Sequence, residues 1–257
     1  TSGWSYPHFR GAFYPANVPA RSELEYASRV FNSLESNRSF YSLLSPAIYR
    51  SWFEQTPSDF VLSLKGGNFI THSKKLRDVE VPLANFFASG PLVLGSKLGP
   101  IVWQLPERLR FDAGRLRDFF GLLPRTTAQA ARLAGHHDQR VRHGVHLRAG
   151  RNRRLRYAIE PRHVSFEDPA FFALAREYGV AIAIADSAAW PCFELVTTDF
   201  VYVRLHGHCA TYRSLYSRRL LEAWKRRILA WRNEQRDVFV YFDNDFQANA
   251  AHNARQL

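Results

Sequence analysis

The sequence predicts a (β/α)8 TIM barrel, a ring of eight parallel strands each followed by a helix, with the first strand truncated at the N-terminus. A strand-type run followed by a helix-type run recurs along the 257 residues, which favours parallel strands with helical crossovers. Eight such units in about 250 residues fit a barrel better than an open doubly wound sheet. No glycine fingerprint for a dinucleotide and no P-loop follows any strand. No linker divides the chain, so we expect a single domain over residues 1–257.

The predicted elements follow from hydrophobic runs and from the residues that begin and end helices. Ser45, Asp112 and Asp168 are placed to cap the helices that follow them, and Gly179 is placed to end one. The expected strand–helix pairs are 31–37 with 45–55, 60–65 with 73–87, 99–106 with 112–123, 156–163 with 168–179, 199–207 with 217–235 and 237–244 with 246–257. A further strand is expected at 180–187, and an eighth would end at residues 1–4, ahead of a helix at 22–30.

The charge balance is strongly basic, with 35 Lys and Arg against 23 Asp and Glu and a formal net charge of +12. Such an excess favours anionic partners, which include nucleic acid, phosphorylated metabolites and anionic surfaces. The alternative is a set of solvated surface arginines. Residues 136–156 carry seven arginines, and this segment either tracks a phosphate backbone or forms a solvated loop.

Cysteine usage and hydropathy predict a cytoplasmic protein without a membrane partner. Cys192 and Cys209 are the only cysteines, too few for a disulfide framework or a zinc site. No stretch approaches the roughly 18–20 apolar residues that span a bilayer, and residues 1–15 lack the order of a signal peptide. Because the chain opens at Thr1 and contains no Met, we expect it to begin inside a longer gene product. The sequence does not predict an oligomeric state.

The run DFVYVRLHG at 199–207 alternates apolar and polar side chains. In a barrel, alternate residues face the helices and the interior. Val201, Val203 and Leu205 should therefore pack on the helices, while Tyr202, Arg204 and His206 point inward. His206 would lie nearest the C-terminal mouth, where TIM-barrel active sites are found.

Polar side chains also end the other predicted strands. The candidates for this mouth are Glu35, Asn37, Lys65, Gln104, Glu160, Arg162, Asp186, Asp243 and Asn244. Buried charge is costly unless it is paired or used, so this recurrence predicts a functional polar mouth. The alternative is a structural ion-pair network. Trp4 and Tyr6 follow the first strand and are candidates for stacking on a sugar or a base.

At these residues the sequence resembles the YecE-like proteins, the group catalogued as domain of unknown function seventy-two. The matching pieces are TSGWSYPHFRGAFYP, ESNRSFYSL, ITHSKKL, KLGPIVWQLP, IEPRHVSF, TDFVYVRLHG and VYFDND, which span the chain in order. The resemblance implies a TIM-barrel fold but no activity, because the family's biochemical role is not established. Two pieces depart from the family pattern: IEPRH stands where VEFRH is usual, and ESN where EIN or EMN is usual.

The mixed charge of the mouth suits acid–base chemistry on a small anionic or polyhydroxyl ligand. His206, Glu160, Asp243 and Glu35 are the candidate catalytic residues, and His206 is the best candidate for proton transfer. The remaining candidates would bind the ligand. We predict an enzyme of hydrolase or lyase/isomerase type, with nucleic-acid binding or processing and a non-catalytic barrel as alternatives.

No cofactor is predicted. Carboxylates with a histidine could bind a divalent metal, but no HExxH motif is present and nearby Arg and Lys would compete for the carboxylates. A metal is the weaker alternative.

Overall fold

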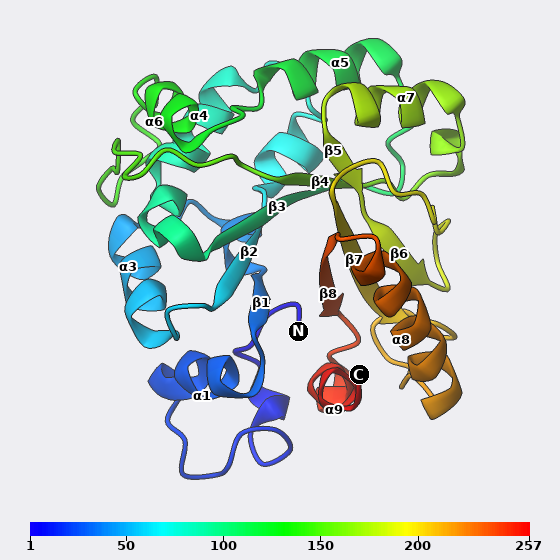
Figure 1. The fold of residues 1–257 in the computed structure, drawn as a ribbon. Coiled ribbons are helices and arrows are strands. Elements are labelled where there is room, and N and C mark those ends of the chain that lie inside the picture. Colours follow the sequence, from blue (N-terminus) through cyan, green and yellow to red (C-terminus); the bar gives the residue numbers. More distant parts are fainter.

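The computed structural model describes all of residues 1–257, and its parallel strands are surrounded by helices (Figure 1). The strands are β1 (Ser33–Ser36), β2 (Val61–Lys65), β3 (Leu98–Gln104), β4 (Tyr157–Glu160), β5 (Val180–Ile182), β6 (Ile184–Ser187), β7 (Phe200–Gly207) and β8 (Asp237–Phe242). The α-helices are α1 (Glu23–Val30), α2 (Arg38–Tyr41), α3 (Pro46–Gln55), α4 (Glu80–Ala88), α5 (Ala113–Leu122), α6 (Thr127–Ala134), α7 (Pro169–Glu177), α8 (Arg218–Asn233) and α9 (Asn249–Gln256). Short 3-10 or π turns lie at Pro7–Phe9, Ala20–Ser22, Phe69–Ser73, Pro91–Lys97, Val164–Phe166 and Phe246–Ala248.

All strand pairs are parallel, and they form two sheets. The first has the order β1-β2-β3-β4-β5 and the second the order β6-β7-β8. The strand predicted at 180–187 is divided at Ala183, since β5 pairs with β4 whereas β6 pairs with β7. The backbone N–H of Ala183 still donates to the Ile159 carbonyl at 2.8 Å. The chain therefore passes from one sheet to the other at this residue.

The strand pairing confirms an α/β fold with parallel sheets, but it does not form a closed barrel. Strands β8 and β1 do not pair with each other. In place of the strand predicted to end at residues 1–4, Ser2 makes one isolated parallel bridge to Glu35. The Ser2 N–H donates to the Phe242 carbonyl at 2.8 Å, and the Gly3 N–H donates to the Glu35 carbonyl at 2.7 Å. Three N-terminal residues thus lie between β8 and β1 at one end.

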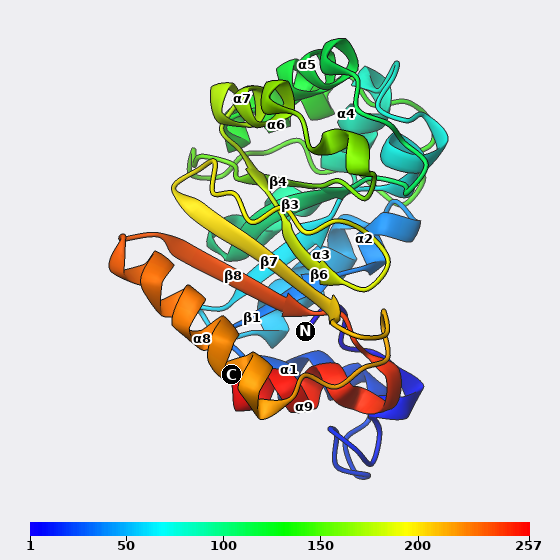
Figure 2. The same cartoon turned by 90° about the vertical axis from the view of Figure 1, so that its right-hand side faces the viewer.

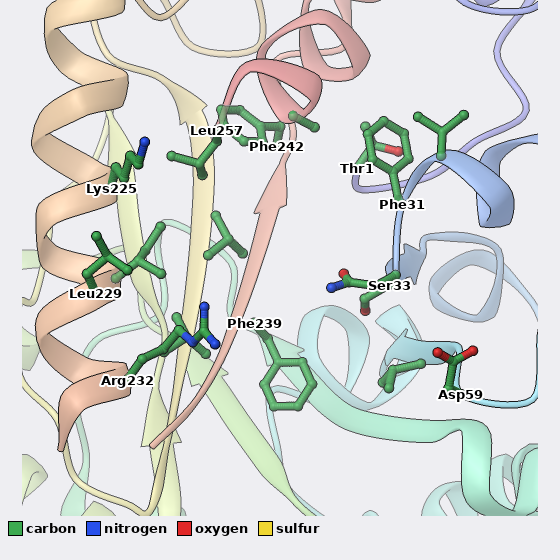
Figure 3. A pocket seen from close by; sticks show the side chains of 17 residues that line it. Thr1, Phe31, Ser33, Asp59, Lys225, Leu229, Arg232, Phe239, Phe242 and Leu257 are labelled. Atoms are coloured by element: carbon green, nitrogen blue, oxygen red, sulfur yellow. The ribbon is translucent and has the colours of Figure 1, made fainter. Parts of the chain in front are cut away.

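A groove of about 710 Å³ lies between β8 and β1 (Figure 3). Eleven of its 17 lining residues are hydrophobic, and they include Phe239 of β8 and Leu229 of α8. Thr1 and Leu257 both line it, which agrees with the closeness of the two termini in Figures 1 and 2. The edges of β1 and β8 therefore face an open, largely apolar groove.

The two faces of β7 are buried in different surroundings, as the sequence alternation predicts. Val201, Val203 and Leu205 belong to the main hydrophobic cluster of 52 residues, which contains residues of both strands and helices. Tyr202 belongs to a separate cluster of seven residues on the other face, together with Tyr241 of β8. Figure 2 shows β7 and β8 side by side, with α8 running along β8. The predicted orientation of this strand is confirmed.

Most predicted helix starts are confirmed, but α4 begins later than predicted. Asp112 and Asp168 cap α5 and α7 by accepting backbone N–H bonds, whereas Ser45 precedes α3 without a side-chain cap. The helix expected at 73–87 begins only at Glu80. Pro82 lacks an N–H and fits a first turn, so a helix beginning at 73 would have to contain it in its interior.

Helix α6 was not expected, and its start is marked by a capping box. The Thr126 side chain accepts from the Gln129 N–H, and the Gln129 side chain accepts in return from the Thr126 N–H. No helix of the structure combines the length and the apolar character needed to cross a membrane.

Candidate functional site

Arg204 lies at the centre of a buried ionic cluster near the C-terminal ends of the strands, and its side chain is 0% exposed. Its Nε and Nη2 donate to the two oxygens of Glu35 at 3.1 and 2.8 Å. Nη1 donates to Glu160 Oε2, and Nη2 also donates to Asp243 Oδ2 at 3.1 Å. Burial alone would lower the pKa of Arg204, but the carboxylates of Glu160, Glu35 and Asp243 hold it well above its usual value. Arg204 therefore stays charged, and its donors are already engaged.

Glu35 reaches this cluster from β1 and has further partners. The Tyr202 hydroxyl donates to its Oε2 at 2.5 Å, and the Ser2 hydroxyl donates to its Oε1. Burial, and then the charge of Glu35, raise the pKa of Tyr202 well above its usual value, so its phenol remains a donor. Ser2 was not predicted as part of the site. Its proximity follows from the backbone bridge to Glu35, which a linear pattern does not show.

Glu160, Arg162 and Gln104 form the adjoining part of the cluster, from β4 and β3. Arg162 Nε donates to Glu160 Oε1 at 2.7 Å, and its Nη2 donates to Gln104 Oε1 at 2.8 Å. Burial would raise the pKa of Glu160, but the guanidinium groups of Arg204 and Arg162 hold it well below its usual value. Glu160 is thus ionised at neutral pH. Pro161 follows the last residue of β4, so it removes no donor from within the strand.

His206 lies between two carboxylates and is fully buried. Its Nδ1 is 3.0 Å from Asp243 Oδ2, and its Nε2 is 3.4 Å from Glu160 Oε1. The Nδ1 atom nevertheless has no hydrogen-bond partner, because the Asp243 oxygen lies off the direction of a ring N–H. Burial would raise the pKa of Asp243, but Arg204 and then His206 hold it below its usual value. The pair is therefore an imidazole beside an ionised carboxylate.

Two aromatic rings cover His206. Trp190 and Tyr212 meet the imidazole edge-on, with ring centroids 5.1 and 5.7 Å away. Trp190 also stacks on the guanidinium of Arg162, whose Cζ is 3.9 Å from the ring centroid. Both rings come from the segments that follow β6 and β7. Trp190 was missed because no sequence pattern marks one loop residue as the cover of a site.

Lys65, at the end of β2, is the cation of this region that has no acceptor. The residue is 6% exposed and its ammonium makes no hydrogen bond or ion pair within the protein, while its Nζ lies 4.1 Å from the centroid of the Phe40 ring. Burial, and then the nearby charge of Arg204, lower the pKa of Lys65 to about 8. A structural ion-pair network would pair this ammonium, so the arrangement leaves one positive charge, on a largely buried side chain, without a partner in the protein.

Five predicted ligand-binding residues lie at the border of the cluster or outside it, and Asp186 is the fifth of them. The Asn37 amide donates to Ser2 Oγ at 3.1 Å and to the Tyr6 hydroxyl at 3.3 Å, so Asn37 and Tyr6 border the cluster. Trp4 instead packs edge-on against Trp52 at 5.2 Å. Asn244 donates to the Ser214 carbonyl and to Asn253, and joins the end of β8 to α9.

Asp186 is not part of the cluster, contrary to the prediction. It pairs in register with Leu205, an outward residue of β7, whereas Ala185 pairs with Arg204. Its carboxylate lies 3.0 Å from His208 Nδ1 and accepts from the indole N–H of Trp224 on α8 at 3.4 Å. The prediction assigned the wrong face, because a polar residue at a strand end does not by itself show which face of the strand points inward.

No group of three or more His, Cys, Asp or Glu side chains is arranged to hold a metal ion. The carboxylates of Glu35, Glu160 and Asp243 all pair with Arg204. The cluster as it stands is therefore suited to organising charge and to binding an anion beside Lys65.

Comparisons with known proteins place this arrangement in a family. A family model described as "Protein of unknown function DUF72" matches residues 1–257. A DUF72 family protein from Thermotoga maritima is similar in structure, with a TM-score of 0.79 and 23% identity, over 100% of this chain and 95% of that chain. A DUF72 family protein from Enterococcus faecalis gives a TM-score of 0.71 and 19% identity, over 91% of each chain. At these identities the structural similarity shows the fold alone.

Among curated proteins, the UPF0759 protein YecE of Escherichia coli strain K12 is 33% identical over 85 residues. That match spans 33% of this chain and only 31% of YecE, so it adds a local similarity. The match of the family model over the whole sequence carries the assignment: the chain belongs to the DUF72 family.

Proposed function

We propose that this protein is an enzyme that binds a small anionic or sugar-like ligand at the C-terminal ends of its strands. The observation that carries the proposal is Lys65, a largely buried side chain whose ammonium has no internal acceptor. A largely buried ammonium without an acidic partner destabilises the folded protein, and no group of the chain offsets this. An anionic ligand would supply the missing partner, and Arg162 adds a second positive charge to the same region.

Acid–base chemistry would come from His206 together with Asp243. An imidazole can accept and donate a proton through its ring nitrogens, and an ionised carboxylate beside it can orient the ring and stabilise its protonated form. Glu160 on the other side would hold the second ring nitrogen. Arg204 and Glu35 would position these groups rather than touch the ligand, because both are fully buried and engaged with each other.

The ligand would reach His206 only if the covering rings move. Trp190 and Tyr212 both lie in connections without helix or strand, and such segments commonly close over active sites. Tyr212 has a φ of +66°, a left-handed conformation that is unusual for an aromatic residue. We propose that these two loops open to admit the ligand.

We also propose that the two sheets act as one incomplete TIM barrel. The continuity of β5 and β6 through Ala183 supports this, as do the hydrogen bonds of Ser2 and Gly3 to strands on opposite sides of the groove. In such a barrel the cluster around Arg204 would lie at the mouth where active sites are found.

The experiment incubates the protein with a panel of sugar phosphates, sugar acids and neutral sugars, and follows each compound by proton NMR. With a compound that the wild type converts, His206→Asn and Asp243→Asn should lose about 10²-fold or more in rate, because an amide cannot carry the proton. Asp186→Asn is the matched control, since its carboxylate also ends a strand but lies outside the cluster. It should keep the wild-type rate.

Urea unfolding of each variant separates lost chemistry from lost structure. His206→Asn with wild-type turnover would remove the imidazole from the mechanism. A wild type that converts no compound of the panel, although Lys65 binds anions, would contradict the catalytic part of the proposal.

A second candidate function is binding of nucleic acid by residues 136–156. In this segment Arg140, Arg154 and Arg156 form ion pairs, whereas Arg142, Arg148, Arg151 and Arg153 are exposed and have no acidic partner. Fluorescence anisotropy with a labelled duplex should show an affinity that falls steeply with salt. A plot of the logarithm of the binding constant against the logarithm of the salt concentration should fall with a slope near one per phosphate contact. Neutralising all four arginines without changing affinity or slope would exclude this surface.

A further inference from the structure

A second cavity, of about 540 Å³, lies beside the C-terminal end of β1. The N-terminal segment, α3 and the start of α1 enclose it. Ser36, which follows the inward-facing Glu35, is one of its lining residues, so the cavity opens on the outer side of β1. Its volume falls within the range of about 300–1,000 Å³ that is typical of small-molecule sites.

The cavity is positively charged. Arg21 and Arg38 are its only charged lining residues, and no carboxylate lines it. Both arginines are exposed, and neither forms an ion pair with any residue of the chain. Guanidinium groups bind phosphate through paired N–H donors. The two arginines therefore offer free N–H donors for a phosphate group.

Aromatic side chains form much of the remaining wall. Trp4 and Trp52 pack edge-on against each other at 5.2 Å, which fixes this side of the cavity. Tyr41 stands at the rim and is 71% exposed. Exposed rings beside polar groups commonly stack on sugar rings and bases.

The inner wall holds two buried polar atoms without a partner. Ser36 Oγ and Asn37 Oδ1 make no hydrogen bond. The Asn37 amide nitrogen is already engaged with Ser2 and Tyr6, which fixes the oxygen as the free group. Unsatisfied buried acceptors are rare, because each loses its hydrogen bonds to water. A ligand with hydroxyl or amino donors would satisfy them after a small rotation of these side chains.

We infer that this cavity binds a phosphorylated sugar ring, either free or as the sugar phosphate of a nucleotide. Arg21 and Arg38 hold the phosphate, and the ring lies against Tyr41. The donors of the ring face Ser36 and Asn37. This site is separate from the proposed catalytic one, because neither Lys65, Arg162 nor His206 lines it.

Isothermal titration calorimetry at constant ionic strength tests the inference in a Lys65→Met background, so that the strand-end site does not contribute. The probes are ribose 5-phosphate, AMP, ribose and inorganic phosphate. Ribose 5-phosphate and AMP should bind saturably. Ribose and phosphate should each bind with an affinity at least about tenfold lower, since each makes only part of the contacts. The double variant Arg21→Gln/Arg38→Gln should weaken the phosphorylated compounds by about tenfold or more. Both arginines are exposed, so this variant should fold normally.

A control variant separates this site from the rest of the surface. Arg148→Gln, which removes another exposed and unpaired arginine, should leave the affinities unchanged. Binding of AMP alone would identify a nucleotide as the source of the ring, and binding of both compounds would show that the free sugar phosphate is sufficient. Phosphate binding as tightly as either compound, no saturable binding, or affinity that is independent of Arg21 and Arg38 would each overturn the inference.

Discussion

At the scale of single residues, Arg204 and Lys65 show two different uses of buried positive charge. Arg204 has carboxylate partners on three sides and stays ionised at any pH that a protein tolerates. Lys65 has none, and burial lowers its pKa to about 8, so its ammonium is destabilised but still predominates at neutral pH. Arg204 thus organises the cluster, while Lys65 leaves a charge for another molecule to meet.

Replacing Arg204 should be among the most destabilising single changes in the chain. Arg204→Met would leave Glu35, Glu160 and Asp243 without the guanidinium that they share, and we expect a loss of about 3–5 kcal/mol in the free energy of unfolding. Arg204→Lys keeps the charge but loses the paired contact with Glu35, so its loss should be smaller. Urea unfolding measures both. Arg153→Met is the surface control, and an Arg204→Met loss as small as that of the control would show that the carboxylates do not depend on Arg204.

Lys65→Met should increase stability at neutral pH and lose this advantage in alkali. The pKa of Lys65 is about 8 in the folded protein and near 10.5 in the unfolded chain, so the unfolded state holds the extra proton between these values. Wild-type stability should therefore rise with pH across this window. We expect the variant to be more stable by on the order of 2–3 kcal/mol at pH 7, with the difference shrinking from pH 8 to 10.5. A difference that does not change with pH would mean that Lys65 is not strained by burial.

At the scale of elements, the sequence predicted correctly those features that depend on residues close together in the chain, such as strand faces and helix starts. The period of two along β7 assigned its inner and outer faces correctly, and Asp112 and Asp168 marked two helix starts. The face of Asp186 was wrong because the register between β6 and β7 decides it, and register is a property of two strands. The division of residues 180–187 into β5 and β6 likewise depends on two different partners. Helix α6 was missed for a different reason, because its capping box is a local pattern that the sequence does contain.

The groove between β8 and β1 gives a prediction at this scale. A short extension of alternating valines fused ahead of Thr1 should pair with both strand edges and bury valine side chains against the apolar lining. We expect a gain of about 1–3 kcal/mol in the free energy of unfolding, from a few cross-strand pairs. The same extension with proline at alternate positions cannot donate to the edges and is the control. Equal stability of the two extended proteins would contradict the barrel arrangement.

At the scale of the whole molecule, the ionic cluster couples folding to pH. The pKa values of Glu160 and Asp243 are lowered in the folded protein, so their contribution to stability is present above about pH 4.5 and is lost as the pH falls below it. Protonation of these two carboxylates should lower the free energy of unfolding by about 3 kcal/mol between pH 6 and pH 3. Each group contributes roughly 1.4 kcal/mol per pH unit below its pKa in the unfolded chain. Urea unfolding at the two pH values measures this. A loss below about 1 kcal/mol would mean that the cluster does not stay intact in the folded state.

The ligand site at the strand ends is tested most directly by anion binding to Lys65. Phosphate is titrated at constant ionic strength and pH 6.5 into a protein carrying Arg21→Gln/Arg38→Gln, so that the second cavity does not contribute, and the melting temperature is followed. The melting temperature should rise with phosphate, and the rise should vanish at pH 9.5, where Lys65 is neutral, and in Lys65→Met at either pH. An equal rise with and without Lys65, or no rise in the parent protein, would contradict an anion site at this position.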